Sequence, residues 1–149
     1  MAAKVLRADV RPGVSPRARA LLGRADAMLS GSVGAADATE MFLDCYIAAL
    51  RGAAAVLEAT PIAASRVRSR SAWVLMAKAA PALDSWAEYF SGFSTTRAAV
   101  QAGLRRSIDE NDADEFYREV GRFLQVVEEY IGVDSRLDRQ EVRPHSMSA

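Results

Sequence analysis

Apolar residues recur at intervals of three and four along most of this chain, which is the spacing of one face of an α-helix. The last such stretch is the clearest. It begins after Asp109, a favourable N-cap residue, and Gly132 is predicted to end it. Its apolar positions are Ala113, Phe116, Tyr117, Val120, Phe123, Leu124, Val127, Tyr130 and Ile131.

Two helices are predicted in the first part of the chain. The first starts at Ser15-Pro16, a hydroxyl N-cap followed by proline at the first helical position, and ends in a turn at residues 31–34. The second covers about residues 36–59 and stops at Thr60-Pro61. Gly52 lies in its apolar stripe, where glycine costs about 1 kcal/mol relative to alanine. We therefore expect another helix to pack closely against Gly52.

Both tryptophans belong to a third helical pattern, over residues 71–92, which Pro81 interrupts. Because proline lacks a backbone N–H and clashes with the preceding turn, a break is predicted near residues 79–80. Gly92 is expected to loosen the chain again, before a short helix over residues 96–103. The whole pattern predicts an all-α fold, an antiparallel bundle of four to five helices with the tryptophans in its core.

The bundle is predicted to occupy residues 15–132. Residues 1–14 show no periodicity and are expected to form a flexible N-terminal arm. Residues 133–149 are polar, contain Pro144 and are predicted to be a disordered tail.

Composition bounds the class of protein. The chain of 149 residues is long enough for one domain, and its hydrophobic share of 50% is ordinary for a soluble globular protein. The single cysteine excludes an internal disulfide and fits a reducing compartment. No segment has the pattern of a signal peptide or a membrane span, so we expect a cytoplasmic protein.

The formal net charge is zero, but the charges are unevenly distributed. Residues 1–106 carry 14 Lys and Arg against 8 Asp and Glu, whereas residues 107–149 carry 5 against 11. Two interpretations remain open: a basic surface for an anionic partner, or an acidic last helix that neutralises basic neighbours.

The usual groups of catalysis are missing from the predicted bundle. The only histidine, His145, lies in the predicted tail, which removes the usual general base and metal ligand. Cys45 is interpreted as a small buried apolar residue. Four carboxylate pairs fall on faces assigned to solvent: Glu40/Asp44, Asp84/Glu88, Asp112/Glu115 and Glu115/Glu119. The sequence therefore predicts no catalytic residue, no metal site and no cofactor.

A basic connection over residues 60–70 is the best candidate for binding. Its arginines alternate with serines, and guanidinium and hydroxyl groups suit phosphate oxygens. The start of the following helix adds unpaired backbone N–H groups, which favour an anion. The candidate anion site comprises Arg66, Arg68, Arg70 and Ser71, joined by Arg105 and Arg106 if the fold brings the two loops together. The alternative is a solvated loop whose arginines pair with the acidic last helix.

The chain resembles the HEPN superfamily, helical bundles named for nucleotide binding in higher eukaryotes and prokaryotes, and is most similar to an alanine-rich actinobacterial branch. The resemblance rests on residues 48–54, 70–75 and 80–83, on Trp86 and Phe90, and on Phe123-Leu124. It covers about residues 15–131 and implies a HEPN-like bundle.

Ribonuclease members of that superfamily carry Arg-x4-6-His, whose residues meet across a dimer interface. Arg139 and His145 have this spacing here, but Pro144 and the polar surroundings place them outside the predicted helices. The resemblance therefore implies a non-catalytic bundle that binds nucleotide, RNA or a partner protein, with a homodimer expected. The alternatives are a homodimeric scaffold without an anion site and a residual ribonuclease. The dimer interface would be formed by Ala48, Ala49, Gly52 and Ala53, or by the edge that carries Tyr89 and Phe93.

Overall fold

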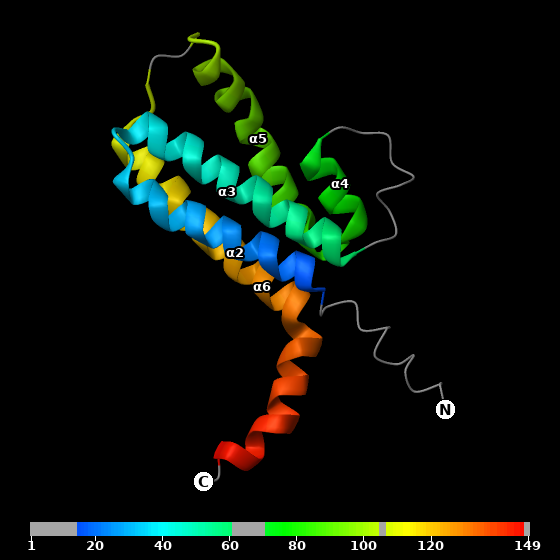
Figure 1. The fold of residues 1–149 in the computed structure, drawn as a ribbon. Coiled ribbons are helices and arrows are strands. Elements are labelled where there is room, and N and C mark those ends of the chain that lie inside the picture. The colour runs from blue at the N-terminus through cyan, green and yellow to red at the C-terminus, as the bar shows by residue number, and fades with distance from the viewer. Residues whose placement is uncertain (1–14, 61–70, 105–106, 148–149) are drawn as a thin grey trace.

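The computed structural model describes the backbone of residues 15–60, 71–104 and 107–147 and the side chains as far as residue 132. In this part of the chain the structure has five α-helices and no strand, which confirms the predicted all-α class (Figure 1). The elements, labelled as in Figure 1, are α2 (Pro16–Gly31), the 3-10 turn η2 (Ser32–Gly34), α3 (Ala38–Ala59), α4 (Ala72–Ala79), the 3-10 turn η4 (Pro81–Leu83), α5 (Asp84–Gln101) and α6 (Glu110–Met147).

Helices α2 and α3 begin at side-chain caps. The Oγ of Ser15 accepts a hydrogen bond from the backbone N–H of Ala18 (3.1 Å), and proline occupies the first position of α2, as predicted. The Oδ1 of Asp37 accepts one from the N–H of Glu40 (2.9 Å), so α3 starts at Ala38. These caps satisfy backbone donors that have no partner within the helix.

The predicted break before Pro81 is confirmed. Helix α4 ends at Ala79, and the backbone of Ala80 leaves the helical region (φ −136°, ψ 81°) before η4 begins at Pro81. The chain therefore changes direction between the two tryptophan-bearing segments. This allows α4 and α5 to pack against each other on one flank of α3 (Figure 1).

The predicted loosening at Gly92 is wrong. Helix α5 continues through Gly92 to Gln101, so no separate helix starts at residue 96. One glycine costs a helix about 1 kcal/mol, which continuous hydrogen bonding on both sides offsets. The predicted stop at Gly103 is confirmed: this residue has φ +79°, and the N–H groups of Gly103 and Leu104 reach the carbonyls of Val100 (3.1 Å) and Ala99 (2.8 Å). This is a Schellman motif.

Helix α6 begins where the sequence predicted but does not end there. The Oδ1 of Asp109 accepts a hydrogen bond from the N–H of Asn111 (3.1 Å). The predicted end at Gly132 and the predicted disordered tail are corrected by the backbone, which stays helical to Met147. Glycine ends a helix when it adopts a positive φ, and Gly132 does not. Figure 1 shows this last part of α6 leaving the bundle.

The core lies between α2, α3 and α6, with α4 and α5 closing one side. Trp73 is 3% exposed and its ring stacks on that of Phe90 at 4.8 Å between centroids. Trp86 is only half-buried but packs against the same cluster, with 5.5 Å between its centroid and that of Phe123. The prediction that the tryptophans belong to the core is therefore confirmed, with Trp86 at its margin.

Gly52 lies at the closest approach of α3 and α6. A Cβ atom at this position would lie 2.7 Å from Cδ2 of Leu124 and 3.0 Å from Cε2 of Phe123. These separations are shorter than van der Waals contact, so only glycine fits without movement of the α6 side chains. The expected close packing at Gly52 is confirmed.

Candidate functional site

Most of the predicted anion site lies outside the described residues. Arg66, Arg68 and Arg70, and also Arg105 and Arg106, belong to the two segments that the structure does not describe. Ser71 is described: it is the N-cap of α4, and its Oγ accepts a hydrogen bond from the N–H of Val74 (3.4 Å). The assembly of these residues into one site stays a prediction.

Cys45 is a fully buried residue of α3. Its thiol lies 3.5 Å from the Oγ of Ser32, which in turn donates a hydrogen bond to the carbonyl of Leu29 (2.6 Å). Burial raises the pKa of the Cys45 thiol to about 11, with a smaller raising effect from Asp44 and a lowering one from the Ser32 hydrogen bond. The thiol is therefore protonated at neutral pH, in keeping with its interpretation as a small apolar core residue.

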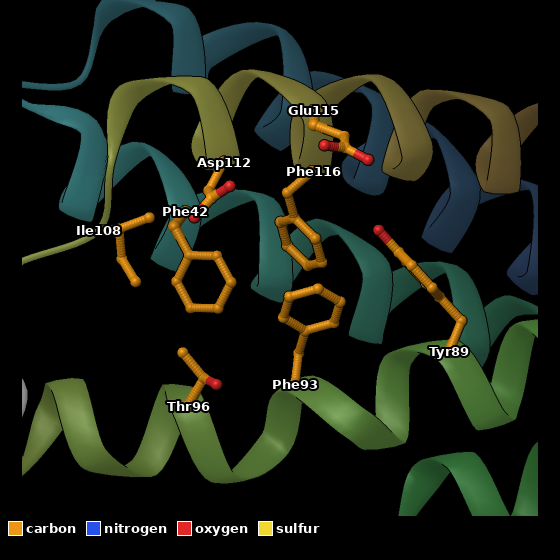
Figure 2. A pocket seen from close by; sticks show the side chains of 8 residues that line it. All are labelled: Phe42, Tyr89, Phe93, Thr96, Ile108, Asp112, Glu115 and Phe116. Atoms are coloured by element: carbon orange, nitrogen blue, oxygen red, sulfur yellow. The ribbon is translucent and has the colours of Figure 1, made fainter.

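A pocket of about 320 Å³ lies between α3, α5 and the first turns of α6. Figure 2 shows its side chains, and we refer to it as the aromatic pocket. It is lined by Phe42, Tyr89, Phe93, Thr96, Ile108, Asp112, Glu115 and Phe116.

Three phenyl rings, one from each helix, form the apolar wall of the aromatic pocket. The centroid of Phe116 lies 4.8 Å from that of Phe42 and 4.7 Å from that of Phe93, and the last two are 6.0 Å apart. The rings are tilted relative to one another by 41° to 49°. Phe42 and Phe116 are only 2% exposed and back the pocket, so its accessible aromatic surface comes from the half-buried Tyr89 and Phe93.

Local hydrogen bonds hold the acidic side of the aromatic pocket in position. The N–H of Ile108 donates to the Oγ1 of Thr39 in the first turn of α3 (2.9 Å), which ties the start of α6 to that helix. Asp109 then caps α6, so that Asp112 and Glu115 follow one turn apart on one face. In Figure 2 Asp112 lies on α6 across from Thr96 of α5, and Glu115 lies farther along α6, above Phe116.

The charged groups that act on Tyr89 at the aromatic pocket are carboxylates. Burial, with smaller contributions from the charges of Glu119 and Glu115, raises the pKa of Tyr89 to about 12. Arg97, on α5, lies with its guanidinium 5.1 Å from the ring centroid of Tyr46 and does not line the pocket. The pocket thus combines aromatic surface with two carboxylates.

Most of the predicted solvent-facing carboxylates are exposed, but Asp44 and Glu119 are half-buried, and one consequence was missed. Asp84, Glu88, Asp112 and Glu115 are all exposed. However, the last two face the aromatic pocket rather than open solvent alone. The sequence signal was the shared face of Tyr89, Phe93 and Thr96 on α5; nothing in the sequence showed that this face lies opposite α6.

The first of the two predicted dimer surfaces is wrong. Ala48, Ala49 and Ala53 are 0% exposed, and Gly52 is buried against α6, so this patch is used inside the bundle. The second, the edge of α5 with Tyr89 and Phe93, forms part of the aromatic pocket.

The part of the chain that the structure describes contains no group of three or more Cys, His, Asp or Glu side chains arranged to hold a metal ion. None of the helices in this part of the chain combines the length and the hydropathy that a membrane crossing requires.

The fold and its matched segment identify the family. No curated protein and no solved structure matches this chain. The model of the HEPN_SAV_6107-like HEPN family matches residues 32–128, which extend from η2 to the last core turns of α6 and include every helix that lines the aromatic pocket. The chain therefore belongs to the HEPN_SAV_6107-like HEPN family.

Proposed function

We propose that this HEPN bundle is a binding module and does not cleave RNA. One observation carries the proposal: among the side chains that the structure describes, Ser32 is the single buried polar residue, and the chain's one histidine, His145, lies beyond Ile131 at the end of the core. An Arg-x4-6-His site needs its histidine within the bundle. Residues 15–132 contain no histidine to take that proton-transfer role.

An RNA-cleavage assay tests this proposal. Purified full-length chain is incubated with labelled single-stranded RNA, beside a His145→Ala variant and a chain that ends at residue 132. We expect the full-length chain to leave the RNA intact. Cleavage that disappears in both altered chains would instead establish the residual-ribonuclease alternative with Arg139 and His145.

For the ligand, we propose an anion such as nucleotide or RNA, bound at Arg66, Arg68 and Arg70 with Ser71 and with Arg105 and Arg106. Two observations support this choice. The first 106 residues carry the excess of positive charge, and the first turn of α4 directly follows the arginine-rich connection. Backbone N–H groups at a helix start and flanking guanidinium groups are complementary to phosphate.

Salt-dependent binding tests the anion site. Affinity for a labelled single-stranded oligonucleotide is measured at low and high salt for the natural chain and for a triple Arg66, Arg68 and Arg70→Ala variant. Loss of three phosphate contacts lowers the slope of log affinity against log salt by about 2. The matched control replaces three exposed arginines elsewhere: Arg17, Arg24 and Arg118. Absence of binding at low salt, or an equal effect of both variants, contradicts the anion site.

The alternative is a homodimeric protein-interaction scaffold without an anion site. The half-buried aromatic edge of α5, with Tyr89 and Phe93, supports this alternative, because aromatic residues are enriched in interfaces. Light scattering after gel filtration measures the mass in solution. A strictly monomeric chain at high micromolar concentration contradicts the scaffold.

A further inference from the structure

We propose that the aromatic pocket between α3, α5 and α6 binds a small organic ammonium ion with an apolar body. The residues that line it differ from those of the proposed anion site, and it would take a ligand of opposite charge. The cation proposal and the anion-site proposal can therefore be contradicted independently, and the test of one does not depend on the test of the other.

The aromatic wall supplies the first part of the argument. Phe42, Phe93 and Phe116 come from three helices and line a single pocket, with centroid separations of 4.7–6.0 Å. The faces of such rings carry partial negative charge and attract cations, while their area buries an apolar group. Because Phe42 and Phe116 are only 2% exposed, a ligand would contact mainly the half-buried rings of Phe93 and Tyr89, which Phe42 and Phe116 support from behind.

The carboxylates supply the second part. Asp112 and Glu115 line the same pocket, and neither forms an ion pair with any residue that the structure describes. Asp112 lies in the first turn of α6, where the helix dipole already favours negative charge. Glu115 lies beyond the first turn of α6, so the helix dipole does not explain why an acidic residue occupies this position.

The surroundings favour a cation over a neutral ligand. Both charged groups that shift Tyr89 are carboxylates, Glu119 and Glu115, and the guanidinium of Arg97 is directed at Tyr46 instead. Glu119 is already paired with Arg122, so a ligand cation would offset mainly the charges of Asp112 and Glu115.

The volume bounds the ligand. About 320 Å³ is at the lower end of small-molecule sites and holds one ring or a branched alkyl group with its ammonium head.

Three ligands of similar shape but different charge test the proposal. Binding of 2-phenylethylammonium, 2-phenylethanol and 3-phenylpropionate to the full chain is measured by calorimetry and by NMR shifts of the pocket residues. We expect the ammonium ion to bind about tenfold more tightly than the alcohol, and the carboxylate to bind most weakly. No binding of the ammonium ion, equal binding of all three, or preference for the carboxylate overturns the proposal.

Matched variants locate the site. Asp112→Asn combined with Glu115→Gln removes both carboxylates and keeps their shapes, and we expect affinity for 2-phenylethylammonium to fall about tenfold. The control, Glu128→Gln with Glu129→Gln, removes two exposed charges from the same helix, more than three turns beyond the pocket. It should change affinity by less than about twofold, because exposed charges at this distance are screened. Equal losses in both pairs overturn the assignment to this pocket.

A third variant tests the aromatic wall. Phe93→Leu keeps an apolar side chain of similar size but removes the ring, and Phe93 is only half-buried, so the bundle should stay folded. We expect a further loss of about fivefold for the ammonium ion and a smaller loss for the alcohol. Circular dichroism confirms folding, and unchanged ammonium affinity in the folded variant contradicts a role for the ring.

Discussion

The indole Nε1 of Trp73 donates a hydrogen bond of 2.9 Å to the hydroxyl oxygen of Tyr46, a residue that precedes it by 27 positions. Both side chains are buried, at 3% and 2% exposed. The bond joins α4 to the middle of α3, and the two rings also meet edge to face at 6.1 Å. It therefore fixes where the segment after the arginine-rich connection returns to the bundle.

Removing the Tyr46 hydroxyl should destabilise the bundle. Tyr46→Phe leaves the indole N–H of Trp73 buried without a partner, and an unpaired buried donor costs about 1–3 kcal/mol. Chemical denaturation measures the free energy of unfolding. A double-mutant cycle with Trp73→Phe should give a coupling of about 1 kcal/mol, because either single change breaks the same bond; additive effects contradict this.

Alanine should have opposite effects at two helical glycines. At Gly52 the added Cβ meets Leu124 and Phe123 at 3.0 Å or less, whereas at Gly23 it meets nothing within 4 Å. Gly23→Ala should stabilise the protein by about 0.5–1 kcal/mol through helix propensity. Gly52→Ala gains the same helix propensity but also overpacks the contact with α6, which costs about 1–3 kcal/mol, so we expect a net loss of stability. Thermal unfolding compares the two, and equal stabilisation contradicts the close approach of α3 and α6.

A second glycine pair tests the course of α5. Gly92 lies inside the helix with open space around it, while Gly103 follows its end with φ +79°. Gly92→Ala should stabilise by about 0.5–1 kcal/mol, and Gly103→Ala should destabilise by about 1 kcal/mol because alanine avoids the left-handed region. Unfolding midpoints measure both changes. A destabilising Gly92→Ala would show that α5 is interrupted there.

Stability should fall at alkaline pH because of Cys45. Its thiol pKa rises from 9.0 to about 11 in the folded state, so folding holds the proton more tightly than the unfolded chain does. The contribution is complete below pH 9 and disappears as pH rises to 11, with a loss on the order of 2 kcal/mol.

The measurement is the free energy of unfolding between pH 8 and pH 11 for the natural chain and for Cys45→Ala. The variant loses some packing at every pH, but the difference between the two proteins should narrow as pH rises. A constant difference contradicts a buried, protonated thiol.

The apolar faces of the helices could be predicted from the sequence because they are local properties. Spacing alone identified the core positions of α6, and the chemistry of Pro81 identified the break between α4 and η4. Gly52 also revealed its role, because a helix-interior glycine has a cost that close packing explains. The predictions from Gly92 and Gly132 were wrong because the modest cost of one glycine does not end a helix.

The aromatic pocket could not be predicted, because its parts are distant in sequence. Phe42 and Glu115 belong to different helices, and each is consistent with an ordinary core or surface position. The chain's periodicity therefore determined by itself which residues face inward and that the fold is a helical bundle. Only the tertiary structure decided that an aromatic edge of α5 lies across from the acidic start of α6, since helix packing angles depend on interlocking side chains from both partners rather than on either helix alone.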